Sequence, residues 1–181
     1  MRERMVAGEP YIANDAELAG EQARASRLLE RFNRMSVDEA DERRGVLLEL
    51  LGHLGEGSEI KPPLRCDYGY RISIGSGTFA NYGLVALDVA TIEIGDDVQI
   101  GPNVQLLTPT HPVEAEPRRA KWEAAEPISI GDNVWLGGGV IVLPGITIGR
   151  KTVVGAGSVV TKPLPSDVVA VGNPARVVRS L

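Results

Sequence analysis

A six-residue period constrains this chain more than any other feature of its sequence. From Ile74 onward the chain divides into units such as IGSGTF, IGDDVQ, IGPNVQ, IGDNVW, LGGGVI and VGAGSV. The first position of a unit is aliphatic at Ile94, Ile100, Leu106, Ile130, Leu136, Val142, Ile148, Val154 and Val160. The second position is often Gly, and the fifth is small or β-branched at Thr78, Val98, Val104, Val134, Val140, Thr152 and Ser158. Neither a helical period nor the regular alternation of a β-sandwich produces this pattern.

Short repeats of this kind are typical of a parallel β-helix. Each unit would form one short strand and one corner, so that three units complete a triangular coil and successive coils stack about 4.8 Å apart. First-position side chains would point inward and pile into columns. Second-position glycines would adopt corner dihedral angles that a β-carbon resists. We therefore expect a mainly β fold, with a parallel β-helix and a C-terminal tail over residues 58–181.

The composition agrees with stacked layers of short, similar strands, because aromatic residues are only 4% of the 181 residues. A net charge of −5 argues against a general nucleic-acid-binding protein. The one cysteine, Cys66, excludes an intramolecular disulfide and fits a reducing compartment. No apolar run is long enough to span a membrane. We expect a cytoplasmic protein that binds neither nucleic acid nor membranes.

Residues 1–57 have helical patterns instead of the six-residue period. Asn14 and Glu17 have capping-box spacing, and apolar residues follow at helical intervals: Leu18, Ala25, Leu28, Leu29 and Phe32. Ser36 and Glu39 have the same spacing, and the apolar stripe of this second helix is Val37, Ala40, Leu47, Leu48, Leu51 and Leu54. Gly55 would end this helix. Both helices are expected to pack their apolar faces against the rest of the protein.

The period stops at TPTHPVEAEPRRAKWEAAEP, residues 108–127, and then resumes. Pro112 and Pro117 disfavour regular strand pairing, so residues 112–127 should form a loop that protrudes from the stack. His111, one of only two histidines, stands where coil becomes loop. Because imidazole ordinarily titrates near neutral pH, His111 is a candidate general base. Glu123 in the same loop is either its partner or an exposed charge.

Several motifs resemble those of a known family. The repeats are similar to those of the hexapeptide-repeat acyltransferases, whose β-helix is left-handed. Within that group, PPLRCDYGYRISIG, TPTHP, IGDNVWLGGGVIVLPGITIG, VGAGSVVTK and VGNPAR resemble the maltose and galactoside O-acetyltransferases, as does the N-terminal RERMVAGEPY. The resemblance covers essentially the whole chain and is closer to the maltose type. It implies a left-handed parallel β-helix, acetyl-CoA as co-substrate, a sugar acceptor, and a homotrimer with its sites between subunits.

The resemblance also implies roles for individual residues. His111 would be the catalytic base and Glu123 would pair with its ring. Asn81 and Asp88, which interrupt apolar positions in ANYGLVALDV, would bind the acceptor, although a corner Asn and a turn Asp remain an alternative. Apart from the resemblance, Trp135 holds an outward position of its unit beside the coil of His111, and it is better placed than Trp122 in the loop to offer an aromatic face to a sugar. The galactoside type has an acceptor-binding aspartate where this chain has Ala13, so the identity of the sugar stays open.

The donor site would lie in the later coils. By resemblance, small residues line the pantetheine arm and basic residues contact the phosphates of coenzyme A, to which Lys and Arg are suited. The residues at these positions are Gly138, Ala156, Thr161, Lys162, Arg176 and Arg179. The alternative for any one of the basic residues is a solvated surface charge.

Two kinds of rival function remain. One is the same scaffold with another acceptor, such as an amino sugar, an oligosaccharide, an antibiotic or serine. The other is a non-catalytic module or a carbonic-anhydrase-like zinc protein, which would need three histidines near subunit interfaces. This chain has only His53, expected on the second helix, and His111. No metal is therefore expected, and acetyl transfer is expected to be direct, without an acyl-enzyme.

Overall fold

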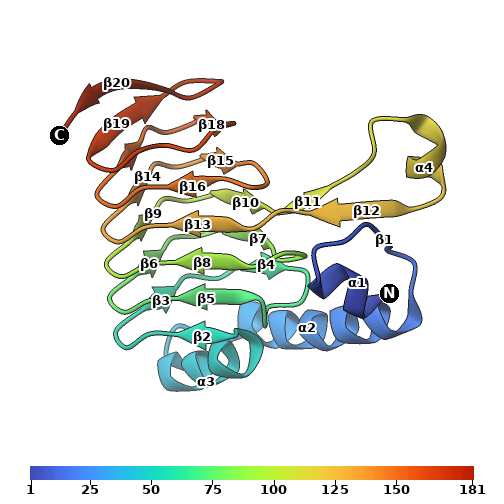
Figure 1. Cartoon of the computed structure of the whole chain (residues 1–181). Coiled ribbons are helices and arrows are strands. Elements are labelled where there is room, and N and C mark those ends of the chain that lie inside the picture. The colour runs from blue at the N-terminus through green and yellow to red at the C-terminus, as the bar shows by residue number, and fades with distance from the viewer.

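The six-residue units fold into short parallel strands that stack as three sheets. In the computed structural model, which describes residues 1–181, these sheets form the three sides of one parallel β-helix (Figure 1). The expectation of a mainly β fold with this architecture is confirmed. We call the sides I, II and III in the order in which the chain visits them in each coil.

Each side is a sheet whose neighbouring strands come from successive coils. Side I contains β2 (His53–Leu54), β5 (Ile72–Ile74), β8 (Ile92–Ile94), β13 (Ile128–Ile130) and β16 (Thr147–Ile148). Side II contains β3 (Glu59–Ile60), β6 (Phe79–Ala80), β9 (Gln99–Ile100), β14 (Trp135–Leu136), β17 (Val153–Val154), β19 (Val168–Val171) and β20 (Arg176–Ser180). Side III contains β4 (Arg65–Cys66), β7 (Val85–Leu87), β10 (Gln105–Leu107), β15 (Ile141–Val142) and β18 (Val159–Val160).

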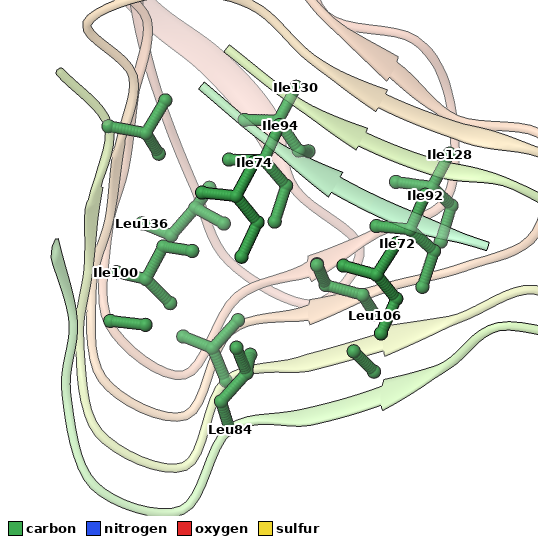
Figure 2. Packing of buried hydrophobic residues seen from close by; sticks show 14 of the residues in the cluster. Ile72, Ile74, Leu84, Ile92, Ile94, Ile100, Leu106, Ile128, Ile130 and Leu136 are labelled. Atoms are coloured by element: carbon green, nitrogen blue, oxygen red, sulfur yellow. The ribbon is translucent and has the colours of Figure 1, made fainter. Parts of the chain in front are cut away.

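The aliphatic first positions stack in columns inside the coils, as expected. On side I, Ile74 pairs in register with Ile94, and Ile94 pairs with Ile130 (Figure 2). All the first-position residues from Ile94 to Val160 are buried, and so are the fifth-position residues. Hydroxyl groups at the fifth position are satisfied inside the core, as where Thr78 Oγ1 donates to the Gly95 carbonyl. The repeat therefore produces the core directly.

The second-position glycines serve a different purpose from the one expected. Their backbone φ angles are not positive; the left-handed angles fall at the fourth position of most units, including Asp97, Asn103 and Lys151. A β-carbon added to Gly101 would lie 2.5 Å from the backbone nitrogen of Gly138 in the next coil. The expectation about corner dihedral angles is therefore wrong. Glycine is needed at the second position because the next coil passes too close for a side chain.

Two helices cover the N-terminal end of the β-helix. They are α2 (Ala16–Arg34) and α3 (Ala40–Leu50), which lie beside β2 (Figure 1). The expected apolar face of α2 is confirmed, because Leu18, Ala25, Leu28, Leu29 and Phe32 are all buried. Most of these residues join one hydrophobic core with the inward side chains of the coils. The helices therefore shield the open end of the β-helix from water.

The expected details of these helices need correction. Asp15, not Asn14, caps α2, because its carboxylate accepts from the backbone N–H groups of Glu17 and Leu18. Glu39 does accept from the Ser36 N–H, as in a capping box, but the helix begins only at Ala40. On α3 the buried residues are Val46, Leu47 and Leu50, whereas Val37 and Leu48 are exposed. His53, expected on this helix, lies instead in strand β2.

The interruption of the repeat is more regular than the two prolines suggested. It contains β11 (Pro109–Thr110), α4 (Ala115–Arg119) and β12 (Trp122–Ala125), and it protrudes from the stack (Figure 1). Strand β12 pairs antiparallel with β11 on one side and with β1 (Tyr11–Ile12) on the other. The expectation that this segment lacks regular strand pairing is wrong. A three-stranded sheet carries it, and the N-terminal arm supplies one of the strands.

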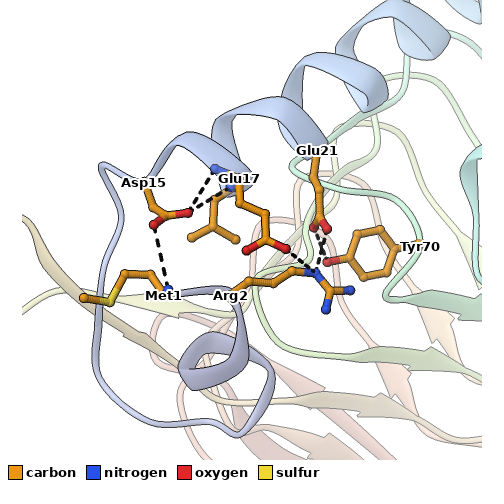
Figure 3. A network of polar contacts seen from close by, with 7 residues as sticks. Met1, Arg2, Asp15, Glu17, Glu21 and Tyr70 are labelled. Carbon is orange, nitrogen blue, oxygen red and sulfur yellow. Dashed lines mark hydrogen bonds and ion pairs between the residues drawn. The ribbon is translucent and has the colours of Figure 1, made fainter.

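The N-terminal arm, residues 1–15, is anchored to α2 and to the coils. It begins with α1 (Arg2–Val6). Arg2 Nε lies 2.6 Å from Glu21 Oε1, and Tyr70 donates to the other oxygen of Glu21 at 2.7 Å (Figure 3). The N-terminal ammonium lies 3.8 Å from Asp15. The chain contains no helix that is both long and apolar enough to cross a membrane.

Candidate functional site

His111 lies directly after β11, where the protruding sheet leaves the edge between sides III and I. Its side chain is exposed. It lines two adjoining cavities of about 240 and 310 Å³, and Glu123 lines both of them as well. No hydrogen bond joins His111 to Glu123 within the chain. The structure therefore brings the two candidate catalytic residues to one place without pairing them directly.

Arg118 fixes the backbone that follows His111. Its Nη1 atom donates to the carbonyl oxygens of both Pro112 and Val113, each at 2.8 Å. Arg118 lies in α4 and also lines the smaller of the two cavities. Sequence reasoning missed this residue because an Arg in a charged loop looks like a solvated side chain. No signal in the sequence shows where the guanidinium donates.

Burial shapes the electrostatics below the protruding sheet. A small hydrophobic cluster of Met5, Tyr11, Leu18, Tyr68 and Val89 fills the space between the arm and the coils. Burial raises the pKa of Asp67 to about 6, and the nearby charges of Asp88 and Glu123 add to the effect. Burial also raises the pKa of the Cys66 thiol, so this cysteine stays protonated. Cys66 packs against the hydrophobic core, and a protonated thiol is a poor nucleophile.

Asp88 was expected at the edge of a cleft, as an acceptor-binding residue, but the structure does not place it there. Its side chain is fully buried. One carboxylate oxygen accepts from the backbone N–H groups of Asp67 and Tyr68, and the other accepts from that of Arg71. Burial raises its pKa, while these hydrogen bonds lower it. Asp88 therefore supports the loop after β4, which corresponds to the turn-Asp alternative, and we exclude it from the candidate site.

The other two candidate acceptor residues lie away from His111 within one chain. Asn81 follows β6 at the edge between sides II and III, and its Oδ1 accepts from the Tyr82 N–H. Trp135 is exposed on the outer surface of side II. His111 stands at the other edge of side III. A single chain consequently does not bring Asn81 or Trp135 together with His111.

Gly138 and Ala156 stack on neighbouring coils at the edge between sides II and III. Gly138 accepts at its carbonyl from the Gly157 N–H at 2.9 Å. The backbone N–H groups of Gly138 and Ala156 donate to no acceptor within the chain, although the amides on either side of them do. Two free amides with only small side chains beside them suit a narrow polar chain such as a pantetheine arm.

The candidate phosphate-binding residues gather near the C-terminal end. Lys162 and Arg176 line one cavity of about 310 Å³. Arg176 pairs with Val171 and Arg179 with Val169, because β20 contains a bulge between these two pairs. The bulge places both arginines on the same face of the strand, since paired residues project to the same side. Thr161 is exposed beside Lys162 after β18 and does not line this cavity.

No three His, Cys, Asp or Glu side chains of the chain lie close enough together to hold a metal ion. His53 is exposed on side I, in a different sheet from the strands that carry His111. Tyr11 is a second residue beside the site that sequence reasoning missed. It lies opposite Glu123 in the protruding sheet, and no sequence pattern indicates a contact between residues so far apart in the chain.

Comparisons with known proteins agree with this architecture. Residues 4–55 match the maltose acetyltransferase hexapeptide capping motif, and residues 127–162 match the hexapeptide repeat of succinyl-transferase. Nodulation protein L of Rhizobium leguminosarum bv. viciae is 48% identical over 176 residues, which are 97% of this chain and 93% of the relative.

Two solved structures resemble the whole chain. A maltose O-acetyltransferase from Clostridium difficile 630 superposes with a TM-score of 0.98 at 48% identity and covers 99% of this chain and 96% of its own. A galactoside acetyltransferase in complex with coenzyme A has a TM-score of 0.96 at 40% identity, with coverage of 99% and 90%. The chain therefore belongs to the maltose and galactoside O-acetyltransferase family of hexapeptide-repeat acetyltransferases.

Proposed function

We propose that this protein transfers the acetyl group of acetyl-CoA to a hydroxyl of a sugar, with His111 as general base. The observation that carries the proposal is the exposed His111 imidazole, which shares two cavities with the Glu123 carboxylate. A sugar hydroxyl is a weak nucleophile near neutral pH. A neutral imidazole can take its proton while the oxygen attacks the thioester carbonyl, after which the thiolate of coenzyme A leaves.

Transfer is direct in this proposal, without an acyl-enzyme. Neither cavity beside His111 is lined by a serine or a cysteine. Cys66, the one cysteine, is held protonated by burial. The hydroxyl of Thr110, which lines one cavity, donates to the Ala124 carbonyl. In this proposal the attacking oxygen belongs to the acceptor itself. The free N–H of Gly138 is suited to donate to the oxyanion that forms on the thioester carbonyl.

A site between subunits would bring together residues that are separated within one chain. The outer surface of side III is largely apolar, with Val85, Leu87, Leu107, Ile141 and Val159 half-buried in the single chain, whereas side I presents His53, Ser73, Glu93, Ser129 and Thr147. In a trimer in which side III of each subunit faces the three-fold axis, this surface is buried. The edge that carries His111 then meets the edge of the next subunit that carries Asn81, Gly138 and Ala156.

We accordingly infer a homotrimer of 19.3 kDa chains. Asn81 and Trp135 of one subunit would bind the acceptor beside His111 of the next, while Lys162, Arg176 and Arg179 would hold the phosphates of coenzyme A. The ammonium group of Lys and the guanidinium group of Arg both suit phosphate binding. Light scattering at micromolar concentration tests the assembly, and a monomer under these conditions would refute the shared site.

The identity of the acceptor needs its own test. Ala13 lines the cavity that contains His111, so the departure from the galactoside type lies within the site. A panel of maltose, glucose, a galactoside, glucosamine, a chitin oligosaccharide, chloramphenicol and serine, followed by release of the thiol of coenzyme A, compares the candidate classes. Faster thiol release with a neutral sugar than with serine or chloramphenicol supports the proposal. Release that no acceptor accelerates would contradict it.

A further inference from the structure

Three residues from distant parts of the chain form one row across the protruding sheet. Tyr11 on β1 lies directly opposite Glu123 on β12. On the other side, Thr110, the last residue of β11, lies opposite Ala124, and continuing this register by one residue would place His111 opposite Glu123, with which it shares two cavities. Directly opposed residues of an antiparallel sheet project to the same face. Tyr11, Glu123 and His111 are therefore consecutive neighbours on one face, with the carboxylate in the middle.

We propose that Tyr11 is a positioning residue for the catalytic base and acts through Glu123. The phenol O–H donates to the Glu123 carboxylate and holds it in the row, where its charge faces the His111 ring. This role rests on the proposed function of His111 as the base. It makes the N-terminal arm a part of the active site.

The burial of Tyr11 fixes its ring beside Glu123. The residue is only 2% exposed, and it lies directly opposite Glu123 in the sheet. Its ring packs in the small cluster with Met5, Leu18 and Tyr68. Burial raises the pKa of Tyr11, and the nearby charge of Glu123 adds to the effect. The phenol is thus a neutral donor at every pH at which the enzyme would work.

The arm that carries Tyr11 is held firmly enough to act as a support. The Ala13 N–H donates to the Lys121 carbonyl and extends the pairing between β1 and β12. On the opposite face of the sheet, the Arg4 guanidinium lies 5.7 Å from the centre of the Trp122 ring. At its start the arm is fixed to α2 through Arg2 and Glu21 (Figure 3). Tyr11 is therefore held both by the protruding sheet and, through the arm, by α2.

Other charged groups also surround the row and must be considered in any titration. Asp67 and Tyr68, from the loop after β4, lie below Glu123 and interact with its charge. Arg118 and Lys121 line the cavity on the side of His111. Neither of these cations forms an ion pair within the chain. None of the four groups occupies a position between Tyr11 and Glu123 in the sheet register.

The experiment follows the two histidines by NMR as the pH is varied in the intact protein. His53 is an internal control because it lies on side I, in a different sheet. Glu123→Gln should lower the pH midpoint of the His111 titration by about 0.5 pH units or more, since a neighbouring negative charge favours imidazolium. Tyr11→Phe keeps the ring but removes the donor, and it should move the His111 midpoint in the same direction. It should also lower kcat about threefold or more for a sugar acceptor.

A matched control separates positioning from general loosening. Tyr70→Phe also removes a half-buried phenol that donates to a carboxylate, Glu21, but outside the row. Tyr70→Phe should leave the His111 titration unchanged, and Tyr11→Phe should have no further effect in a Glu123→Gln background. An unchanged His111 titration in Tyr11→Phe, a full effect in the Glu123→Gln background, or an equal effect of Tyr70→Phe would each overturn the role. The NMR readout needs no acceptor, so an inactive wild-type protein would contradict the proposed function separately.

Discussion

At the scale of single residues, Lys151 has an unusual backbone conformation for a lysine. The fourth position of most units has a positive φ angle. Asn103, Asn133 and Gly157 occupy this position in other coils, whereas Lys151 occupies it here with a φ of 57°. A left-handed conformation costs an ordinary L-residue about 1–2 kcal/mol, and Asn tolerates it better. The strand and core positions could be predicted from the repeat. The positive φ of Lys151 could not, because it becomes visible only when the backbone geometry of the corner is known.

We expect Lys151→Asn to raise the free energy of unfolding by about 0.5–1 kcal/mol, because Asn adopts this φ with less strain. Urea unfolding at fixed protein concentration measures the change. Arg150→Asn is the matched control, since it removes a positive charge from the adjacent residue, whose φ is not positive. Equal stabilisation by both substitutions would indicate a charge effect and not relief of strain.

Asp67 makes the stability of the protein depend on pH. Burial raises its pKa in the folded state to about 6, above the value for an unfolded chain. The folded state therefore binds the proton more tightly, and this contribution to stability is lost as the pH rises from about 4 through 6. Asp67→Asn should stabilise the protein by about 1–2 kcal/mol at pH 7.5, after allowance for partial exposure, and by much less at pH 4. Chemical unfolding at the two pH values measures both, and an equal change at both would contradict the assignment.

At the scale of elements, the repeat predicted the strands of the β-helix from β5 to β18, whereas β2 falls where a helix was expected and β19 and β20 lie beyond the repeat. A period of six residues with buried first and fifth positions leaves few other ways to form a core. The protruding sheet could not be predicted, because β1 and β12 are far apart in the sequence and Pro112 and Pro117 suggested an irregular loop. The sequence could place His111 at the interruption, where the structure has it exposed. It could not place Asp88, since sequence alone cannot tell whether a corner carboxylate faces inward or outward.

The short helix α4 matters through Arg118, which holds the backbone directly after His111. We expect Arg118→Ala to lower kcat about tenfold, because a base displaced by a fraction of an ångström no longer meets the acceptor hydroxyl. The Michaelis constant for acetyl-CoA should change little. Arg119→Ala is the control, since this neighbouring Arg makes no hydrogen bond to the backbone of Pro112 or Val113. Steady-state kinetics of both variants compare them, and equal losses would exclude a specific role for Arg118.

At the scale of the whole molecule, the bulge in β20 brings Arg176 and Arg179 to one face of the strand, and Arg176 lines a cavity together with Lys162. Arg176→Ala should raise the Michaelis constant for acetyl-CoA far more than that for the acceptor, by about 10-fold to 100-fold, since a charged hydrogen bond contributes about 1.5–3 kcal/mol. Initial rates with each substrate varied in turn measure both constants. A similar rise in both would show that the arginine does not act on the donor.

The central claim is that His111 is the general base of an acetyl transfer to a sugar. Removing its exposed side chain leaves no cavity in the core, so His111→Ala should fold, assemble and bind coenzyme A as the wild-type protein does. The most direct measurement is kcat for this variant with saturating acetyl-CoA and the best sugar of the acceptor panel, together with calorimetry of coenzyme A binding. We predict a fall in kcat of about 10²–10⁴-fold with unchanged binding. Turnover near the wild-type rate would show that the interruption of the repeat does not supply the base.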